Sequence, residues 1–520
     1  MSIPSLGLVD INHVSYDTST NSLTWMDGEG GLSKIHAIKG ERMVAVVPCP
    51  EDSNLMSYIW LDNSPYYSSS SSVSDKQQQQ QPEYVLKRFE AAGECPASLR
   101  QFIVIGSPLS HLYPAKSADH NNLHIIISTL SGTHKASPFY TTLLKPLLTT
   151  LHLTELHDYT THTTSSPDTI TNLTQTIFRP RAQRGIKQTI ILLAGDGGLI
   201  ELVKSLTAVP GGVAEHEGHV FVPPVVALVP MGTGNATAYS AGIVSERDAT
   251  VGLRGLVGGV PRRLPMFRVG FSRGAEYVTD GGRGRKPVFV PGDGDGDGGG
   301  GGEEGEIYGA VVLSWGMHAS LVGDSDTPEY RRFGRERFQM AAKELLFPAD
   351  GSAPHVYRGR VNVTTKTTDP VSGGEMLRTR VLERSEHMYI LVTLCSKLEK
   401  GFTISPASRP LDGRLWFVHF GPLASEAVME VMQLAYDGGR HVVEKGDVVG
   451  YEEVEAVRVD FCEGEKEERW RRICIDGMIV VVEDGGWVEV RKGEREVVRL
   501  VVPEGKGVVG DDNGERRHIN

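Results

Sequence analysis

The stretch Ile190–Gly198, with the sequence IILLAGDGG, is a short apolar run that ends in a glycine-rich turn. Apolar residues then recur at positions 199, 202, 203 and 206, which is the spacing of one face of a helix. A second unit of the same kind, VVALVPMGTGN, runs from Val225 to Asn235 and leads into the alanine-rich residues 236–241. Each unit therefore predicts a buried strand, a glycine turn and a helix.

The two turns have the composition of anion-binding loops. Glycine lets backbone amides approach an anion closely, and the N-terminus of the following helix adds a favourable dipole. Two such turns in neighbouring units can hold a polyphosphate between them. The alternative is a pair of ordinary strand-to-helix turns, but the ordered pair favours phosphate binding.

Both turns resemble the signature of the diacylglycerol kinase catalytic domain, which diacylglycerol, ceramide and sphingosine (long-chain base) kinases share. That family carries Gly-Gly-Asp-Gly followed by a helix with Glu, and then Pro-x-Gly-Thr-Gly-Asn. Here residues 194–197 read AGDG, with Glu201 in the helix, and residues 230–235 read PMGTGN. The resemblance extends from about residue 119 to about residue 490.

Further segments carry the resemblance in the family's order. Ile125–Gly132 (IIISTLSG) resembles the opening strand and its Asn-Pro-x-x-Gly turn, with Ser-Thr in place of Asn-Pro. Ser314–Phe338 resembles a segment typical of sphingosine and ceramide kinases, which makes these kinases the most similar group. Residues 412–413 and 475–477 resemble the two C-terminal Asp-Gly turns.

The chain is predicted to fold in three parts. Strands alternate with helices over residues 119–262, the pattern of a parallel α/β sheet, and the resemblance implies an NAD-kinase/phosphofructokinase-like nucleotide-binding kinase domain there. Residues 263–500 are strand-rich and fit a β-sandwich, lipid-binding domain with a Gly/Asp insert at 283–306 and one amphipathic helix at 328–347. Residues 1–118 predict a small β-rich N-terminal lobe with a disordered Ser/Gln loop at 68–81, and residues 501–520 predict a polar tail.

Composition argues against several classes of function. The formal net charge is −12 and the basic residues are scattered, so no nucleic-acid-binding footprint appears. The five cysteines lack metal-ligand spacing, which favours free thiols in a reducing compartment. Neither a signal peptide nor an apolar run of membrane-spanning length is recognised, so we expect a cytoplasmic protein that contacts the membrane peripherally.

One segment imitates a calcium site. The spacing of Asp293, Asp295, Asp297 and Glu304 matches an EF-hand loop. Pro291 precedes it, five successive glycines run through it, and no helix is expected on either side. We therefore interpret the segment as an acidic flexible linker and predict no calcium site there, and we assign no set of metal ligands in the chain.

The resemblance assigns roles to the turn residues. Asp196 is expected to take the proton of the acceptor hydroxyl or to organise Mg²⁺, and helix capping is the alternative. Asn235 can cap a helix as well as contact phosphate. The residues expected to contact the phosphates of ATP are Ser131, Gly132, Thr133, Thr163, Gly195, Gly197, Gly232, Thr233, Gly234 and Asn235. Thr163 represents the stretch from Thr161 to Thr164, within which the resemblance leaves the register open.

A second group of expected site residues follows in the strand-rich region. Arg331 and Arg337 match two arginines that reach the nucleotide phosphates in the sphingosine kinase pattern, and solvated charges are the alternative. Six residues apart on one helix they point about 120° apart, so both reach one phosphate chain only if Arg331 lies at or before the helix start. Asp324 aligns, across a two-residue insertion, with the acidic residue that recognises the polar head of the lipid.

One departure from the family pattern affects the chemistry. Asp476 and Gly477 match the final Asp-Gly turn and are assigned to the nucleotide, but Met478 stands where the family usually has Glu. A methionine neither binds magnesium water nor accepts a proton. The resemblance implies an ATP- and Mg²⁺-dependent lipid kinase acting on a hydroxyl of a sphingoid base, ceramide or diacylglycerol. The alternatives are a catalytically weak member of the family that binds lipid or nucleotide, motivated by Met478, and an NAD kinase.

Overall fold

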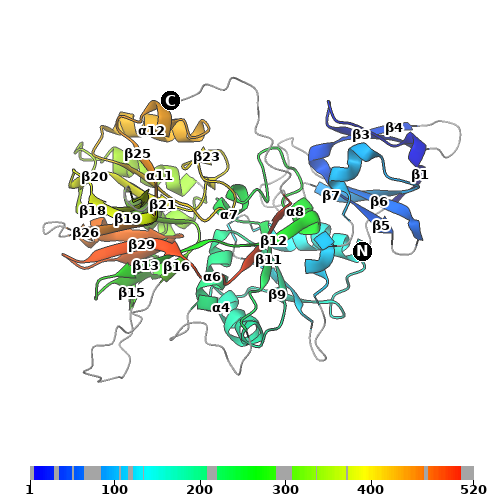
Figure 1. Ribbon diagram of the computed structural model, residues 1–520, viewed down its shortest axis with the longest axis horizontal. Helices are drawn as coiled ribbons and strands as arrows, with labels where there is room; N and C mark the ends of the chain where they lie inside the picture. Colours follow the sequence, from blue (N-terminus) through cyan, green and yellow to red (C-terminus); the bar gives the residue numbers. More distant parts are fainter. Residues whose placement is uncertain are drawn as a thin grey trace.

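The computed structural model describes residues 5–27, 34–49, 52–63, 84–104, 107–114, 121–129, 131–132, 134–207, 220–288, 307–334, 336–369, 373–461 and 467–504. They form three blocks in a row, with the N-terminal strands at one end, a sheet with helices in the middle and a strand-rich region at the other end (Figure 1). The Ser/Gln loop at 68–81, Thr133, the EF-hand-like residues 293–304 and the chain from residue 505 lie outside the described residues.

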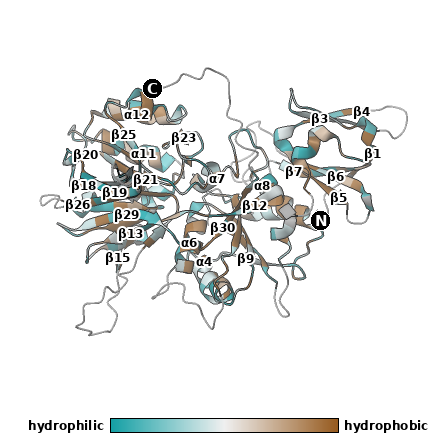
Figure 2. Ribbon diagram, viewed as in Figure 1, coloured by the Kyte–Doolittle hydropathy of each residue, from teal (hydrophilic) through white to brown (hydrophobic). Residues whose placement is uncertain are grey.

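A six-stranded sheet occupies the middle block. Its order is β12 (Gly259–Arg263), β30 (Arg499–Pro503), β11 (Val225–Pro230), β10 (Thr189–Ala194), β8 (Leu123–Ile127) and β9 (Tyr159–Thr163). All neighbours are parallel except β12 and β30, which are antiparallel. β8 and β10 are buried throughout, which explains their largely apolar sequences. Figure 2 shows brown, hydrophobic residues in this central block near β30. The strands and helices predicted from the two glycine units are confirmed.

Short helices pack on both faces of this sheet. Ile191 and Leu193 of β10 share a core with α2, α3 and α8, whereas Ile190 and Leu192 share another with α4, α6 and α7. The helices of this block are α2 (Ala136–Phe139), α3 (Lys145–Thr150), α4 (Thr169–Leu173), α5 (Arg179–Gln183), α6 (Asp196–Thr207), α7 (Ala236–Ser240) and α8 (Leu253–Gly258).

The strand-rich region predicted after residue 265 is confirmed and contains two large antiparallel sheets. One has the order β16 (Ile307–Gly309), β13 (Met266–Phe271), β29 (Trp487–Gly493), β26 (Ala456–Phe461), β18 (Tyr357–Thr368) and β19 (Glu375–Val381), with β20 (Glu386–His387) beside β18. The other has the order β15 (Gly284–Pro287), β14 (Glu276–Thr279), β28 (Met478–Val481), β27 (Arg472–Ile475), β17 (Val312–Gly316), β21 (Tyr389–Thr393), β24 (Leu415–Phe420) and β25 (Gly450–Val454). Both sheets contribute side chains to one buried cluster, with Phe267 from the first and Trp315 and Phe417 from the second.

Helices interrupt these sheets more often than predicted. They are α9 (Met317–Ser325), α10 (Pro328–Arg331), α11 (Glu336–Leu346), α12 (Ser425–Tyr436) and α13 (His441–Glu444), and a small hairpin of β22 (Lys397–Glu399) and β23 (Phe402–Thr403) is also present. The single helix predicted over 328–347 is wrong, because the chain breaks between α10 and α11. Gly334 there has a φ of +58°, in the left-handed region that a continuous helix excludes.

The N-terminal block is a β structure, as predicted. Four strands have the order β1 (Ser5–Asp10), β7 (Tyr84–Ala92), β6 (Asp52–Asn63) and β5 (Met43–Cys49), and three more are β2 (Ser15–Asp17), β3 (Ser22–Asp27) and β4 (Lys34–Lys39).

The end of the described chain returns to the central sheet. The predicted boundary between residues 500 and 501 falls inside β30, whose Val501 and Val502 are buried. The first residues of the predicted polar tail are therefore a strand between β11 and β12. The rest of the division into domains stays a proposal.

Candidate functional site

The two glycine turns touch each other through their backbones. β10 and β11 are paired in register up to Ala194 opposite Pro230, so the turns that follow them begin side by side. A Cβ atom on Gly195 would lie 2.7 Å from the Cα of Gly232, and a Cβ on Gly232 would lie 2.7 Å from the Cα of Gly195. Any side chain at either position would push the turns apart.

The turn after β8 joins this pair. A Cβ atom on Gly132 would lie 2.6 Å from the Cγ2 of Thr233, and the amide of His134 donates to the carbonyl of Ser131 over 2.8 Å. The structure thus brings Ser131 and Gly132 to the second glycine turn, while Thr133 lies outside the described residues. All three turns follow the carboxyl ends of adjacent parallel strands, where ligands of open α/β sheets bind.

Asp196 links the two glycine turns. Its carboxylate accepts hydrogen bonds from the amides of Ala236 (2.7 Å) and Thr237 (2.9 Å) in the first turn of α7. The helix that Asp196 caps is therefore that of the next unit, whereas its own helix was the one considered from the sequence. Burial raises the pKa of Asp196, and the two amides oppose this only in part.

Asn235 holds its own turn closed. Its Oδ1 accepts from the amide of Gly232 and its Nδ2 donates to the carbonyl of Gly232, both over 2.9 Å. Asn235 has a φ of +59° and its side chain makes no capping bond to α7, because Asp196 occupies those amides. In the first glycine turn, by contrast, Gly197 is exposed, and a Cβ atom there would meet nothing within 4 Å.

A second carboxylate comes from the strand-rich region. Asp476 accepts hydrogen bonds from three successive amides, those of Ala310 (2.7 Å), Val311 (2.9 Å) and Val312 (2.7 Å). Burial raises the pKa of Asp476 to about 6, and the nearby charge of Asp196 adds to the effect. The two predicted carboxylates therefore lie close enough to repel each other. The three amide donors were missed because backbone groups leave no sequence pattern.

The turns lie where the central sheet meets the strand-rich region. In α7 the hydroxyl of Ser240 donates to the carbonyl of Lys397 over 3.1 Å and accepts from its amide over 3.0 Å. A Cβ on Gly234 would lie 3.1 Å from the carbonyl oxygen of Leu398, so Gly234 closes against the β22 strand. The buried thiol of Cys395 is near both carboxylates, and burial followed by their charges raises its pKa.

The threonine held against the first turn is Thr164. The amide of Thr129 donates to Thr164 Oγ1 over 3.0 Å, and Thr129 Oγ1 donates to the Thr164 carbonyl over 2.8 Å. Thr163, the predicted residue, ends β9 and is exposed. The run of threonines indicated the segment, but the pleat of the strand decides which hydroxyl faces the turn.

Arg331 and Arg337 converge on one carboxylate. Arg331 Nη2 lies 2.8 Å from Asp326 Oδ2, and Arg337 Nη1 lies 3.4 Å from Asp326 Oδ1. Arg331 ends α10 and Arg337 lies in the first turn of α11, so the break at Gly334 lets both point the same way. The structure thus brings the two arginines to each other through Asp326, and their ion pairs do not include the glycine turns.

Asp324 borders a cavity of about 510 Å³. Lys204 of α6, the turn at Gly281 and Gly282, and Gly477 and Met478 also line it. Its carboxylate is already paired, with Arg469 Nη2 on Oδ2 and Arg472 Nη1 on Oδ1, each at 2.7 Å. Sequence reasoning missed both arginines, which lie 145 and 148 positions further along the chain and belong to no motif.

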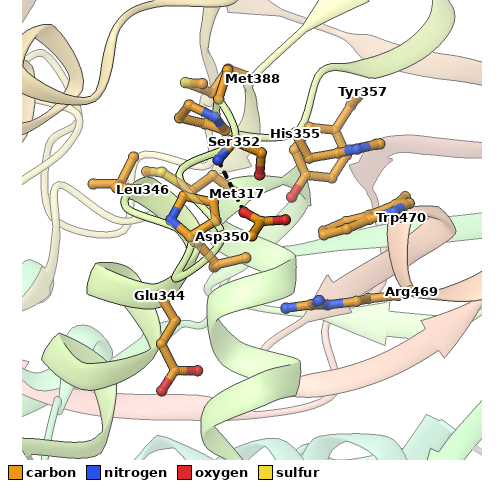
Figure 3. Close-up of a pocket in the computed structure, with 14 residues that line it drawn as sticks. Met317, Glu344, Leu346, Asp350, Ser352, His355, Tyr357, Met388, Arg469 and Trp470 are labelled. Atoms are coloured by element: carbon orange, nitrogen blue, oxygen red, sulfur yellow. Dashed lines mark hydrogen bonds between the residues drawn. The ribbon is translucent and has the colours of Figure 1, made fainter.

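A smaller cavity of about 310 Å³ lies beside Arg469 (Figure 3). Met317, Leu346 and Met388 line it together with Trp470, whose ring stacks on His355 at a centroid distance of 4.0 Å. Arg469 therefore lines this cavity and also pairs with Asp324, which borders the larger one.

The carboxylates present suit a magnesium ion only in the company of phosphates. Among the described residues, no group of three or more His, Cys, Asp or Glu side chains is placed to hold a metal ion. Asp196 and Asp476 each accept backbone amides already, although a carboxylate has lone pairs for further partners. Mg²⁺ is commonly held by one or two carboxylates plus substrate phosphates, and such a set fits here.

In the described part of the chain no helix has the length and apolarity needed to cross a membrane.

Comparison with known proteins identifies the segment that holds the turns. Residues 122–269 match the diacylglycerol kinase catalytic domain. A search of curated proteins finds no match. Two solved structures from Bacillus anthracis strain Sterne, of a proposed diacylglycerol kinase and of a diacylglycerol kinase, are similar at 10% identity, over 74% of this chain and 98% of each of theirs, with TM-scores of 0.44 and 0.41. The three glycine turns lie in the segment that matches the diacylglycerol kinase catalytic domain, the family that the two turns resemble in sequence.

Proposed function

We propose that the protein is an ATP-dependent lipid kinase that phosphorylates a hydroxyl of a sphingoid base, ceramide or diacylglycerol. The observation that carries this proposal is the meeting of three glycine turns and two half-buried carboxylates at the junction of the central sheet and the strand-rich region. The finer fold assignment, an NAD-kinase/phosphofructokinase-like domain followed by a β-sandwich, belongs to the same proposal.

ATP, when bound, supplies the phosphoryl group, and the glycine turns are the residues to hold its phosphates. Gly132 and Gly197 are exposed and Ser131 and Thr233 are half-buried, so the backbone amides of these turns can approach an anion. In this proposal Thr164 replaces Thr163 as the threonine nearest the first turn.

Asp196 is the proposed proton acceptor for the lipid hydroxyl. Its raised pKa makes it a stronger base than an ordinary aspartate, and the two amides of α7 fix its orientation. Asp476 lies close to it and with it provides the negative charge that Mg²⁺ bound to the nucleotide would neutralise.

The acceptor side is the cavity of about 510 Å³ that Asp324 borders. The Ser314–Phe338 segment, by its resemblance to sphingosine and ceramide kinases, makes sphingolipids the first candidates. Such substrates reside in membranes, so the proposal includes a cytoplasmic protein in peripheral contact with a membrane and without a nucleic-acid partner.

A second candidate function is a catalytically weak member of the family that binds lipid or nucleotide. Met478 lines the same cavity directly after Asp476 and Gly477, where the family usually has Glu. An NAD kinase is a third candidate, which the Ser314–Phe338 segment disfavours.

One assay separates the three functions. Purified protein is incubated with γ-labelled ATP, Mg²⁺ and, in turn, sphingosine, ceramide, diacylglycerol and NAD. Label in a lipid supports the proposal, label in NAD contradicts it, and nucleotide binding without transfer identifies the weak member.

The Asp196→Asn variant tests the assigned base. It should reduce phosphoryl transfer by about 10²–10⁴-fold, the usual contribution of a general base, while thermal unfolding shows that the protein remains folded. Wild-type turnover in this variant would rule out the role.

A further inference from the structure

We propose that Arg469 and Arg472 determine acceptor specificity: by holding Asp324 they exclude lipids with a protonated amine next to the reacting hydroxyl and admit lipids with a neutral head. The inference rests on the proposed lipid kinase function and concerns the same cavity. It reverses the role that resemblance suggests for Asp324, in which the carboxylate receives the polar head of the lipid.

The first step is the state of the carboxylate. One guanidinium binds each oxygen of Asp324 at 2.7 Å, and the exposed fractions are 20% for the Asp324 side chain, 19% for Arg472 and 43% for Arg469. The three side chains together carry a charge of about +1. A carboxylate with a guanidinium on each oxygen offers little attraction to a further cation, and a partly buried triad of this sign repels one.

The second step is that neighbouring residues hold both arginines in place. The Arg469 guanidinium lies 4.5 Å from the centre of the Trp470 ring, and the two side chains run alongside each other in Figure 3. The carbonyl of Trp470 accepts a 2.8 Å bond from Trp315 Nε1. Arg472 begins β27 and packs on Gly323. A Cβ atom on Gly323 would lie only 3.2 Å from Nη1 of Arg472. An amine would therefore have to displace cations that the fold already positions.

The third step is the charge of the remaining cavity wall. Lys204, Lys286 and Arg331 line it as well as Arg472. Of the other lining carboxylates, Asp326 is bound by Arg331 and Arg337, and Asp280 lies exposed at the edge. Four cations and three carboxylates thus line the cavity, and Lys204 also lies 3.9 Å from Glu201. Asp280 is the rival site for an amine.

The chemistry of the lipid head follows from this wall. Hydroxyl, ester and amide oxygens accept hydrogen bonds from guanidinium and ammonium groups, so a glycerol or N-acylated head can be bound. A protonated amine has no acceptor to offer and adds a like charge. Discrimination here depends on repulsion of the wrong acceptor as much as on attraction of the right one.

The test compares acceptors of matched solubility in the same mixed micelles. We measure kcat/KM with γ-labelled ATP for dioctanoylglycerol, a short-chain ceramide and sphingosine, together with micelle binding of each lipid by protein fluorescence. The wild type should favour the better neutral lipid over sphingosine by at least tenfold. Arg469→Gln combined with Arg472→Gln should raise kcat/KM for sphingosine about tenfold, and adding Asp324→Asn should cancel that gain.

Matched controls separate the triad from general charge effects. Arg285→Gln removes a neighbouring arginine, paired with Glu468 at 3.1 Å and not with Asp324, and should leave the preference unchanged. The single Arg469→Gln variant, at the more exposed arginine, should show part of the gain if the double variant does not fold.

The outcomes distinguish failure of this inference from failure of the proposed lipid kinase function. A wild type that prefers sphingosine overturns the inference and leaves the kinase intact, and loss of that preference in Asp280→Asn would identify the amine receptor. Folded arginine variants without a gain for sphingosine also overturn it. Failure to transfer phosphate to any lipid overturns the proposed function, and the inference with it.

Discussion

At positions 195 and 232 the absence of a side chain is what lets the two glycine turns touch. Their Cβ positions are 2.7 Å from the opposing Cα atoms, whereas the Cβ position of Gly197, two residues along the same motif, is open. Gly195 is therefore required for the contact between the turns and Gly197 is not, a difference that the packing shows and the motif does not.

Alanine substitutions in the first turn should have opposite effects on stability. We expect Gly195→Ala to lower the free energy of unfolding by about 1–3 kcal/mol, because overpacking forces the two turns apart. Gly197→Ala lies inside α6 and should raise it by up to about 1 kcal/mol through helix propensity. Denaturant unfolding of the two variants measures the difference, and equal effects would mean that the turns do not touch.

Asp476 should make stability depend on pH. Its pKa rises from 3.8 to about 6 on folding, so the folded protein binds the Asp476 proton more tightly than the unfolded chain does. The resulting stabilisation is fully present below the unfolded pKa of 3.8 and is lost as the pH rises through 6. At about 1.36 kcal/mol per pH unit the loss is about 3 kcal/mol.

The Asp476→Asn variant cannot titrate at this position, so it is the matched reference. Its free energy of unfolding should gain about 2.4 kcal/mol on the wild type between pH 4 and pH 7, because part of the full difference falls below pH 4. Denaturant titrations of both proteins at several pH values give the difference. A difference that stays constant with pH would show that the Asp476 pKa is not raised.

At the scale of elements, apolar periodicity predicted most strands and failed at chain breaks. The runs at 190–194 and 415–420 appear as β10 and β24 because a buried strand is a local pattern of residues. The long helix expected over 328–347 keeps its apolar period across Gly334, yet the φ of +58° there divides it. This break, which periodicity did not indicate, is what brings Arg331 and Arg337 together on Asp326.

Strand β30 should be required for the central sheet. Leu500 is fully buried between β11 and β12, so Leu500→Ala should lower the free energy of unfolding by about 2–5 kcal/mol. Arg499→Ala, at an exposed position in the same strand, should change it far less. Similar effects of both substitutions in denaturant unfolding would argue that the strand does not pair as described.

At the scale of the whole molecule, one arginine joins the N-terminal strands to the central block. Arg254 of α8 donates to the carbonyls of Gly40 and Met43, each over 2.7 Å, and its guanidinium lies 5.3 Å from the centre of the Phe102 ring. Burial lowers the pKa of Arg254, so its charge is largely removed from water at this contact.

Arg254→Met should therefore loosen the N-terminal block. We expect a loss of about 1.5–3 kcal/mol, because hydrogen bonds from a charged donor are lost and two carbonyls lose that partner. Limited proteolysis should release the N-terminal block faster than from the wild type. Arg100→Met, at an exposed position in the same block, is the control and should not change the cleavage rate.

The sequence by itself determined the strands, the positions of the glycine turns and the match of residues 122–269 to the diacylglycerol kinase catalytic domain, because each of these depends on residues that are near neighbours in the chain. Only the tertiary structure decided the partners. Asp196 caps α7, Asp476 lies close to Asp196 and Asp324 is held by Arg469 and Arg472, in pairs separated by 40 to 280 positions. The order of strands in the sheets brings these groups together, and a local sequence pattern carries no information about that order.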